Sequence, residues 1–196
     1  MRFPLILLLA MSLVAEPRLF DMKPSPANAF ELYIHKTGFL SGKVHRFVFD
    51  QYEGEIKLDV ANPENATVEL TVQSASAMCR DAWLSAKDQK KVLEFALKDM
   101  LDAERYPTIR FVSSSIRKLP ADVFEVQGNL TIRDITKPVT VNVKMLPQPD
   151  GSMKFEGSSK FKMTSLGLKP PSAALGTIGT KDEMMFEFKQ IAVPSK

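Results

Sequence analysis

The sequence predicts a mainly β protein, a barrel or a sandwich, with one helix inserted between an early and a late group of strands. Apolar and polar residues alternate with a period of two in seven segments after residue 30, as expected for strands with one buried face. One stretch, residues 85–102, changes to helical spacing. With two more strands near 31–37 and 44–50, the total is eight or nine, a number typical of barrels and sandwiches.

The strands are separated by short turn-forming clusters, such as Asn62-Pro63, Leu119-Pro120 and Asp150-Gly151. Each of the seven alternating segments has its own set of apolar residues, and we expect each set to face one side of the sheet. In chain order, these residues are Ile56, Leu58 and Val60; Val68, Leu70 and Val72; Ile109 and Phe111; Phe124, Val126, Leu130 and Ile132; Val139, Val141, Val143 and Met145; Phe155, Phe161 and Met163; and Met184, Phe186 and Phe188.

The helical stretch at residues 85–102 is amphipathic. Its lysines at 87, 91 and 98 share one face with Glu94, whereas Leu93, Leu97 and Met100 lie on the other. Ser85 and Asp88 resemble a capping box at its start. We therefore expect about four turns of helix, ending before Pro107 and lying over one end or one side of the sheet.

Residues 1–29 have the features of a signal peptide. A twelve-residue apolar run, Pro4 to Ala15, follows one Arg and is too short for the roughly 20 residues that span a bilayer. Ala27-Asn28-Ala29 fits the small-x-small cleavage preference better than Ala15 does. We expect a domain at residues 30–196 in the periplasm or outside the cell, with an uncleaved N-terminal anchor as the alternative.

The net charge and the small number of Cys and His residues exclude several classes of function. A formal net charge of +3 provides no basic field for nucleic acid. Cys79 is the only cysteine, and His35 and His45 are the only histidines, so an internal disulfide, a C-x-x-C pair and common zinc motifs are absent. We predict no enzyme, no metal site and no required cofactor. An enzyme that pairs Cys79 with a histidine stays an alternative.

The apolar face of the predicted sheet is rich in Phe and Met, which tolerate irregular apolar contents. An eight-stranded barrel either fills its interior or holds one small ligand, and the pattern alone leaves both open. His45, Phe47 and Phe49 occupy alternate positions and should face the same side of their strand. The His45 imidazole could therefore bind a ligand's polar end. The loop from Lys169 to Lys181 is a candidate gate at the barrel mouth.

Two segments carry a resemblance to a known family. These are YPTIRFVSS, residues 106–114, and VQGNLTIRDITKPV, residues 126–139, supported by Gly54-Glu55-Ile56, Leu84-Ser85 and the stretch from Leu166 to Gly179. With them, residues 38–190 resemble the YceI-like domain family of bacterial lipid-binding proteins. The chain departs from that family's usual pattern at Asp134, where Gly is common, and in its longer helical stretch.

The resemblance implies an exported, lipocalin-like, eight-stranded antiparallel barrel. Its ligand would be a polyisoprenoid such as an isoprenoid quinone, or a fatty amide, held non-covalently. We expect the inward side chains to contact this ligand. The predicted ligand-binding residues are His45, Phe47, Phe49, Leu70, Phe111, Phe124, Val126, Leu130, Val141, Phe161, Met163 and Phe186.

Other functions stay open at this stage. One is a structural or stress-protective interaction module with a filled core and no ligand. Another is an outer-membrane barrel with its apolar face toward lipid, although the helix and the hydrophilic C-terminal end argue against any stable membrane span. The sequence leaves a homodimer open and predicts no nucleic-acid partner.

Overall fold

The protein is built from twelve strands and one principal helix, and the computed structural model describes residues 16–195. In chain order, these elements are β1 (Arg18–Met22), β2 (Ala29–Gly38), β3 (Val44–Phe49), β4 (Tyr52–Leu58), β5 (Thr67–Gln73), β6 (Ala77–Cys79), α1 (Ala86–Phe95), β7 (Thr108–Lys118), β8 (Val123–Ile132), β9 (Ile135–Pro147), β10 (Met153–Lys162), β11 (Ser172–Ala173) and β12 (Ile178–Pro194).

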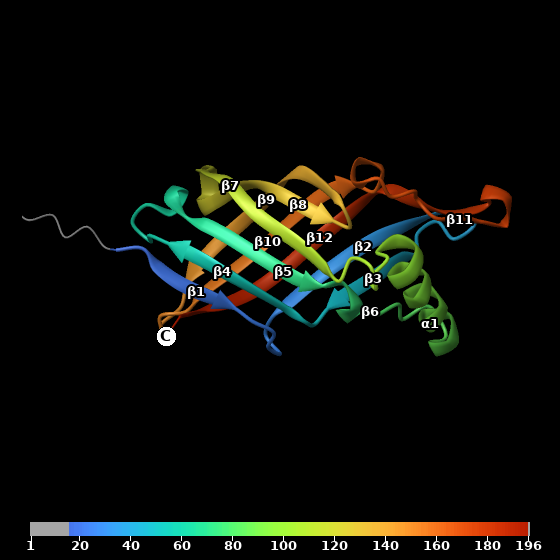
Figure 1. Cartoon of the computed structure of the whole chain (residues 1–196), viewed down its shortest axis with the longest axis horizontal. Helices are drawn as coiled ribbons and strands as arrows, with labels where there is room; N and C mark the ends of the chain where they lie inside the picture. The colour runs from blue at the N-terminus through green and yellow to red at the C-terminus, as the bar shows by residue number, and fades with distance from the viewer. Residues whose placement is uncertain (1–15, 196) are drawn as a thin grey trace, which may run out of the picture.

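The sheet closes into an antiparallel barrel (Figure 1). Eight strands follow one another around it in the order β1, β4, β5, β7, β8, β9, β10 and β12, and β12 pairs back to β1. At the other end of the barrel, β2 lies along β12, with β3 and β6 beside it. The predicted eight-stranded barrel is confirmed, and the structure decides against a sandwich.

The strands β2, β3 and β6 are continuations of ring strands after short interruptions. β1 and β2 both pair with β12, while β3 and β4 pair with β2 and β1 respectively. β5 and β6 in turn pair with β4 and β3. Each pair of segments therefore occupies one position in an up-and-down barrel. Interruptions at residues 23–28, 50–51 and 74–76 hide this continuity in the sequence.

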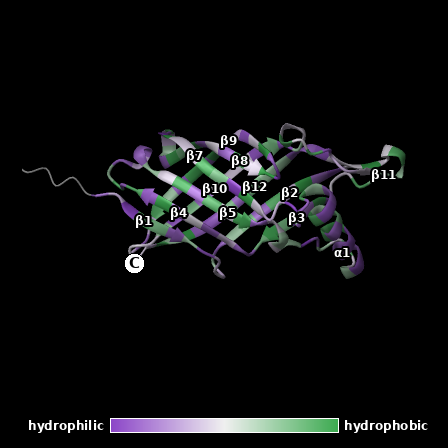
Figure 2. Cartoon of the chain, viewed as in Figure 1, coloured by the Kyte–Doolittle hydropathy of each residue, from purple (hydrophilic) through white to green (hydrophobic). Residues whose placement is uncertain are grey.

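Alternation along the strands points one set of side chains into the barrel and the other toward solvent. One end is filled by a cluster that includes Phe20, Met22, Leu58 and Phe155. Val60 departs from the expected pattern, because β4 ends at Leu58 and leaves Val60 51% exposed. Figure 2 shows the alternating hydrophilic and hydrophobic bands across the barrel wall.

The helix covers the opposite end, and the prediction of a helix over one end or side is confirmed. Ser85 caps α1 by accepting a hydrogen bond from the backbone N–H of Asp88. A π-helical turn, Ala96–Met100, extends the helix. Leu93, Leu97 and Leu101 pack against the cluster that contains Phe30 and Phe49, so the helix is attached to the barrel through its apolar face.

The expected leader, residues 1–29, extends into the barrel. Residues 1–15 lie outside the described part of the chain, but β1 falls within this range and is paired with β4 over its whole length. Phe20 and Met22 of β1 are 2% and 5% exposed. Cleavage after Ala29 would therefore remove a strand segment and two core side chains.

Candidate functional site

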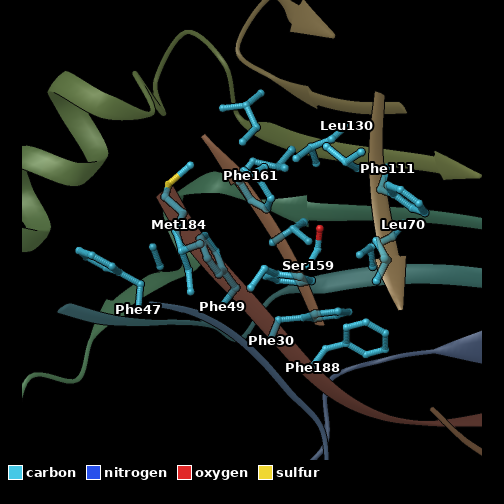
Figure 3. A pocket seen from close by; sticks show the side chains of 18 of the residues that line it. Phe30, Phe47, Phe49, Leu70, Phe111, Leu130, Ser159, Phe161, Met184 and Phe188 are labelled. Carbon is cyan, nitrogen blue, oxygen red and sulfur yellow. The ribbon is translucent and has the colours of Figure 1, made fainter. Parts of the chain in front are cut away.

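An apolar cavity of about 450 Å³ lies inside the barrel. Its wall comes from the inward side chains of the strands, several of which Figure 3 shows converging on the same space. All twelve residues that the sequence predicted to bind a ligand line this cavity. Their position on the inner face follows from the alternation of side chains along each strand, while their contact with a ligand stays a prediction.

Two glycines allow aromatic rings to lie flat against the wall. A Cβ added at Gly128 would come within 2.4 Å of the Phe111 ring, and one added at Gly157 would come within 2.6 Å of the Phe188 ring. Both glycines occupy inward positions, so the neighbouring rings cover bare backbone. Larger residues at 128 or 157 would push these rings into the cavity.

A group of stacked and tilted rings forms another side of the cavity. The Phe30 ring lies 5.7 Å from that of Phe186, nearly parallel to it, and 5.9 Å from that of Phe188. Tyr52 meets Phe30 edge-on at 4.6 Å. Such contacts add to the stability gained from burial, so this part of the wall is held in a defined arrangement.

Few polar side chains line the cavity. The inward row of β2 runs Phe30, Leu32, Ile34 and then Lys36, so a lysine ends an apolar row near the helix-covered end. Burial lowers the pKa of Lys36, although the nearby charge of Asp81 opposes this shift. Ser159 contributes a hydroxyl in mid-barrel, but its Oγ donates to the Thr140 carbonyl at 2.6 Å. The wall of the cavity therefore offers mainly apolar contacts.

The cavity opens beside α1. Among the described residues that line it, only Lys91 and Phe95 are exposed, and both belong to α1. Pro171 and Lys36 lie on the wall at the same end. The opposite end is closed by the cluster around Phe20. A ligand would therefore enter between the helix and the strands, rather than through the far end.

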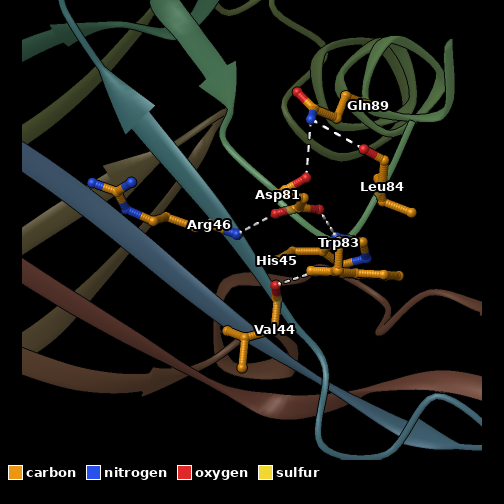
Figure 4. A network of polar contacts seen from close by, with 7 residues as sticks. All are labelled: Val44, His45, Arg46, Asp81, Trp83, Leu84 and Gln89. Carbon is orange, nitrogen blue, oxygen red and sulfur yellow. Dashed lines mark hydrogen bonds and ion pairs between the residues drawn. The ribbon is translucent and has the colours of Figure 1, made fainter. Parts of the chain in front are cut away.

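A buried polar network ties the segment before the helix to β3 (Figure 4). Asp81 is 1% exposed and accepts a hydrogen bond from the His45 ring at 2.5 Å and another from the Arg46 backbone N–H at 2.7 Å. The side chain of Gln89 donates to the Asp81 carbonyl at 2.9 Å. Trp83 Nε1 donates to the Val44 carbonyl, also at 2.9 Å. His45 therefore lines the cavity and anchors the helix at its mouth.

The arrangement around Cys79 does not favour a nucleophile. Its thiol is buried, and burial raises its pKa to about 11. A thiolate is the reactive form of cysteine, and little would exist at neutral pH. Within residues 16–195, no cluster of three or more His, Cys, Asp or Glu side chains is arranged to hold a metal ion.

The expected gate, residues 169–181, is more ordered than a free loop. β11 pairs with the start of β12, and the Thr177 carbonyl accepts a hydrogen bond from the Phe39 backbone N–H at 2.9 Å. The loop therefore forms a hairpin joined to the β2–β3 turn, and it extends the barrel beyond its mouth (Figure 1).

Comparison with known proteins agrees with this architecture. Residues 25–190 match the YceI-like domain. The chain belongs to the YceI-like domain family. The UPF0312 protein of Azotobacter vinelandii is 28% identical over 126 residues, 62% of each chain. A UPF0312 protein of Pseudomonas aeruginosa is 31% identical over the same share. In both, the match spans less than two thirds of the relative's length.

Solved structures share the fold of this YceI-like domain. BcnA of Burkholderia cenocepacia superposes with a TM-score of 0.65 at 22% identity, covering 84% of this chain and 96% of BcnA. A structure described as a polyisoprenoid binding domain, from Saccharophagus degradans, gives a TM-score of 0.59 at 9% identity. It covers 90% of this chain and 98% of that one. At these identities the likeness is one of fold.

The segments that resemble the YceI-like family meet in the cavity wall. The first forms β7 and carries Phe111, while the second forms the β8–β9 hairpin and carries Gly128, on which the Phe111 ring lies. The departure at Asp134 is accommodated, because the positive φ in that turn, 58°, belongs to Arg133. The barrel expected for the YceI-like family thus keeps its wall despite the departure.

Sequence reasoning missed several lining residues. The helix contributes Val92, Phe95 and Met100, and β2 contributes Lys36. The two-residue alternation along β2 could have identified Lys36, because Lys36 continues the inward row of Phe30, Leu32 and Ile34. The helical residues carried only an amphipathic signal, which does not tell which strands the helix covers. No helix within residues 16–195 is long and apolar enough to cross a membrane.

Proposed function

We propose that this protein is an exported, non-catalytic lipid-binding protein. Its ligand would be a polyisoprenoid, such as an isoprenoid quinone, or a similar long-chain amphiphile such as a fatty amide. The observation that carries the proposal is the apolar cavity of about 450 Å³ inside a closed barrel. Membership of the YceI-like family and the fold shared with a described polyisoprenoid binding domain support it.

The size of the cavity bounds the ligand. A cavity of about 150 Å³ accommodates benzene, so 450 Å³ has room for roughly eighteen carbon atoms on the same scale. Burial contributes about 0.8 kcal/mol per CH₂, before the cost of immobilising the ligand is subtracted. A longer tail would leave part of its length at the mouth, where α1 and the β11 hairpin would cover it.

Orientation would come from the polar groups near the mouth. Lys36 and the His45 imidazole lie on adjacent strands, and both line the cavity. A head group placed there would lie beside hydrogen-bonding groups, and the tail would point toward the Phe20 cluster. A few convergent polar groups at the edge of an apolar pocket are typical of small-molecule sites.

Native mass spectrometry of the purified protein, followed by organic extraction, tests this proposal. We expect a stoichiometric adduct that releases a long-chain isoprenoid or fatty compound. A ligand-free mass that stays unchanged after incubation with quinones and polyprenols would contradict the proposal. Such a result would favour the alternative function, a structural or stress-protective module with a filled core. That alternative is the weaker candidate, because the barrel contains a cavity.

Export is tested separately. Fractionation of cells that produce the full chain should recover the protein from the periplasm or the medium, shortened at its N-terminus. Recovery of an unshortened chain from the cytoplasm would contradict the proposed location and leave the binding proposal unaffected.

A further inference from the structure

Two turns project together beyond the mouth of the cavity. The first turn is residues 38–43, from the last residue of β2 to the start of β3, and the second is residues 172–177, which contain β11. We call the two turns together the mouth tip. The Phe39 backbone N–H donates to the Thr177 carbonyl at 2.9 Å. A Cβ added at Gly38 would come within 2.0 Å of the same oxygen. The two turns therefore form one joined projection (Figure 1).

The mouth tip carries the two most exposed large apolar side chains among the described residues. Phe39 is 87% exposed, and the exposure of Leu175 is 107% of its reference value. The next most exposed is Val60, at 51%. Figure 2 shows hydrophobic colour at the end of the β11 hairpin. Side chains with almost no neighbours contribute nothing to the packing of the barrel.

The backbone of the tip is strained where it presents Leu175. Ala174 and Leu175 have φ values of 50° and 55°, a region that costs non-glycine residues free energy. No buried contact of Leu175 offsets this cost, since its side chain is fully exposed. The strain thus accompanies the outward presentation of an apolar side chain, a combination found where a surface has a binding role.

The two chain segments that contain the tip carry basic residues and no acidic ones. Residues 32–49 and 163–181 contain no Asp or Glu. They contain Lys36, Lys43, Arg46, Lys169 and Lys181, of which only Arg46 is paired with a carboxylate, that of Glu31. Apolar side chains flanked by lysines suit an anionic lipid surface, which attracts nearby basic residues and accommodates apolar ones at the acyl boundary.

We propose that the mouth tip inserts Phe39 and Leu175 into an anionic lipid bilayer and so places the cavity mouth against the membrane. The tip overhangs the end of the barrel at which Lys91 and Phe95 of α1 are exposed beside the cavity. A lipid tail could then pass between bilayer and cavity with little exposure to water. This docking surface is independent of which ligand the cavity holds.

Flotation of the purified protein with vesicles tests the proposal. Vesicles of phosphatidylcholine alone should bind weakly, and vesicles that also contain phosphatidylglycerol should bind strongly. Phe39→Ser and Leu175→Ser should each weaken binding about tenfold, the lower end for removing a buried apolar side chain. Lys43→Gln and Lys169→Gln should each weaken it about fivefold, only with the anionic vesicles.

The matched control is the double variant Leu146→Ser/Val193→Ser, because these side chains are 42% and 48% exposed near the opposite end of the barrel. It should float like the wild type. Thermal unfolding should show that all variants fold, since the changed side chains are exposed. Failure of the wild type to float with anionic vesicles, or equal flotation of Phe39→Ser/Leu175→Ser, would overturn the proposal, whatever ligand the cavity contains.

Discussion

Filling the middle of the cavity should separate ligand binding from folding, and Ser159→Phe is the sharpest way to do so. Ser159 lies at an inward position of β10 and is 6% exposed. A phenyl ring needs a cavity of about 150 Å³, the size that accommodates benzene. The 450 Å³ cavity would therefore shrink to roughly 300 Å³, and its capacity would fall by about six carbon atoms.

The expected loss of affinity follows from that capacity. Six carbon atoms at about 0.8 kcal/mol each amount to about 5 kcal/mol, a factor of up to about three thousand in Kd. Stability should change little. The variant loses the Ser159–Thr140 hydrogen bond, worth about 1 kcal/mol, and gains about 1.5–3 kcal/mol from ring burial.

Titration of the ligand-free protein with a polyprenol, followed by native mass spectrometry, measures the effect. Ser158→Phe is the matched control, because the neighbouring Ser158 is exposed on the outer face of the same strand, and it should bind normally. Ser159→Leu, with a smaller side chain, should give an intermediate Kd. If a folded Ser159→Phe variant binds the same lipid with unchanged affinity, the cavity is not the binding site.

Three further predictions concern the parts that support the site. Asp81→Ala should lower the free energy of unfolding by about 3–5 kcal/mol, because it removes the acceptor of the His45 and Arg46 hydrogen bonds, and it should speed ligand release; unchanged urea unfolding would contradict this. The Arg46 guanidinium holds the pKa of Glu31 below its usual range, so this pair stabilises the fold above the unfolded-state pKa, about 4.5, and the benefit disappears as pH falls through the lowered pKa. Glu31→Gln should therefore cost up to about 1 kcal/mol at neutral pH and nothing in strong acid, as measured by urea unfolding across pH. Deleting residues 1–29 should destabilise the barrel by at least about 3 kcal/mol, since β1 is lost, and urea unfolding would measure the change.

Local patterns in the sequence accounted for most of the barrel wall. Residues at inward positions, from Phe111 to Phe186, alternate with polar residues, and this alternation alone indicates which side chains share a face. The boundaries of the helix were also accessible, because Ser85 caps it and its apolar positions recur with helical spacing. These signals are local, and each depends on residues within a few positions of one another.

The cavity itself could not be predicted. Phe and Met side chains at inward positions are compatible with a filled core or with a pocket, and the difference depends on how far opposite walls lie apart. The close approach of the Phe111 ring to Gly128 keeps that ring flat against the wall. This contact joins two residues seventeen positions apart on neighbouring strands, so no local sequence pattern predicts it.

The sequence by itself determined the class of fold, the inward and outward faces of most strands, and the resemblance to the YceI-like family. Only the tertiary structure decided that β1 belongs to the barrel, that Lys36 ends the inward row at the mouth, and that the turn with Phe39 is joined to the turn with Leu175. The physical reason is distance along the chain. The alternation of apolar and polar residues shows which face of a single strand meets water. The closure of the barrel, the volume of the cavity and the position of its mouth depend on contacts between segments up to about 170 residues apart.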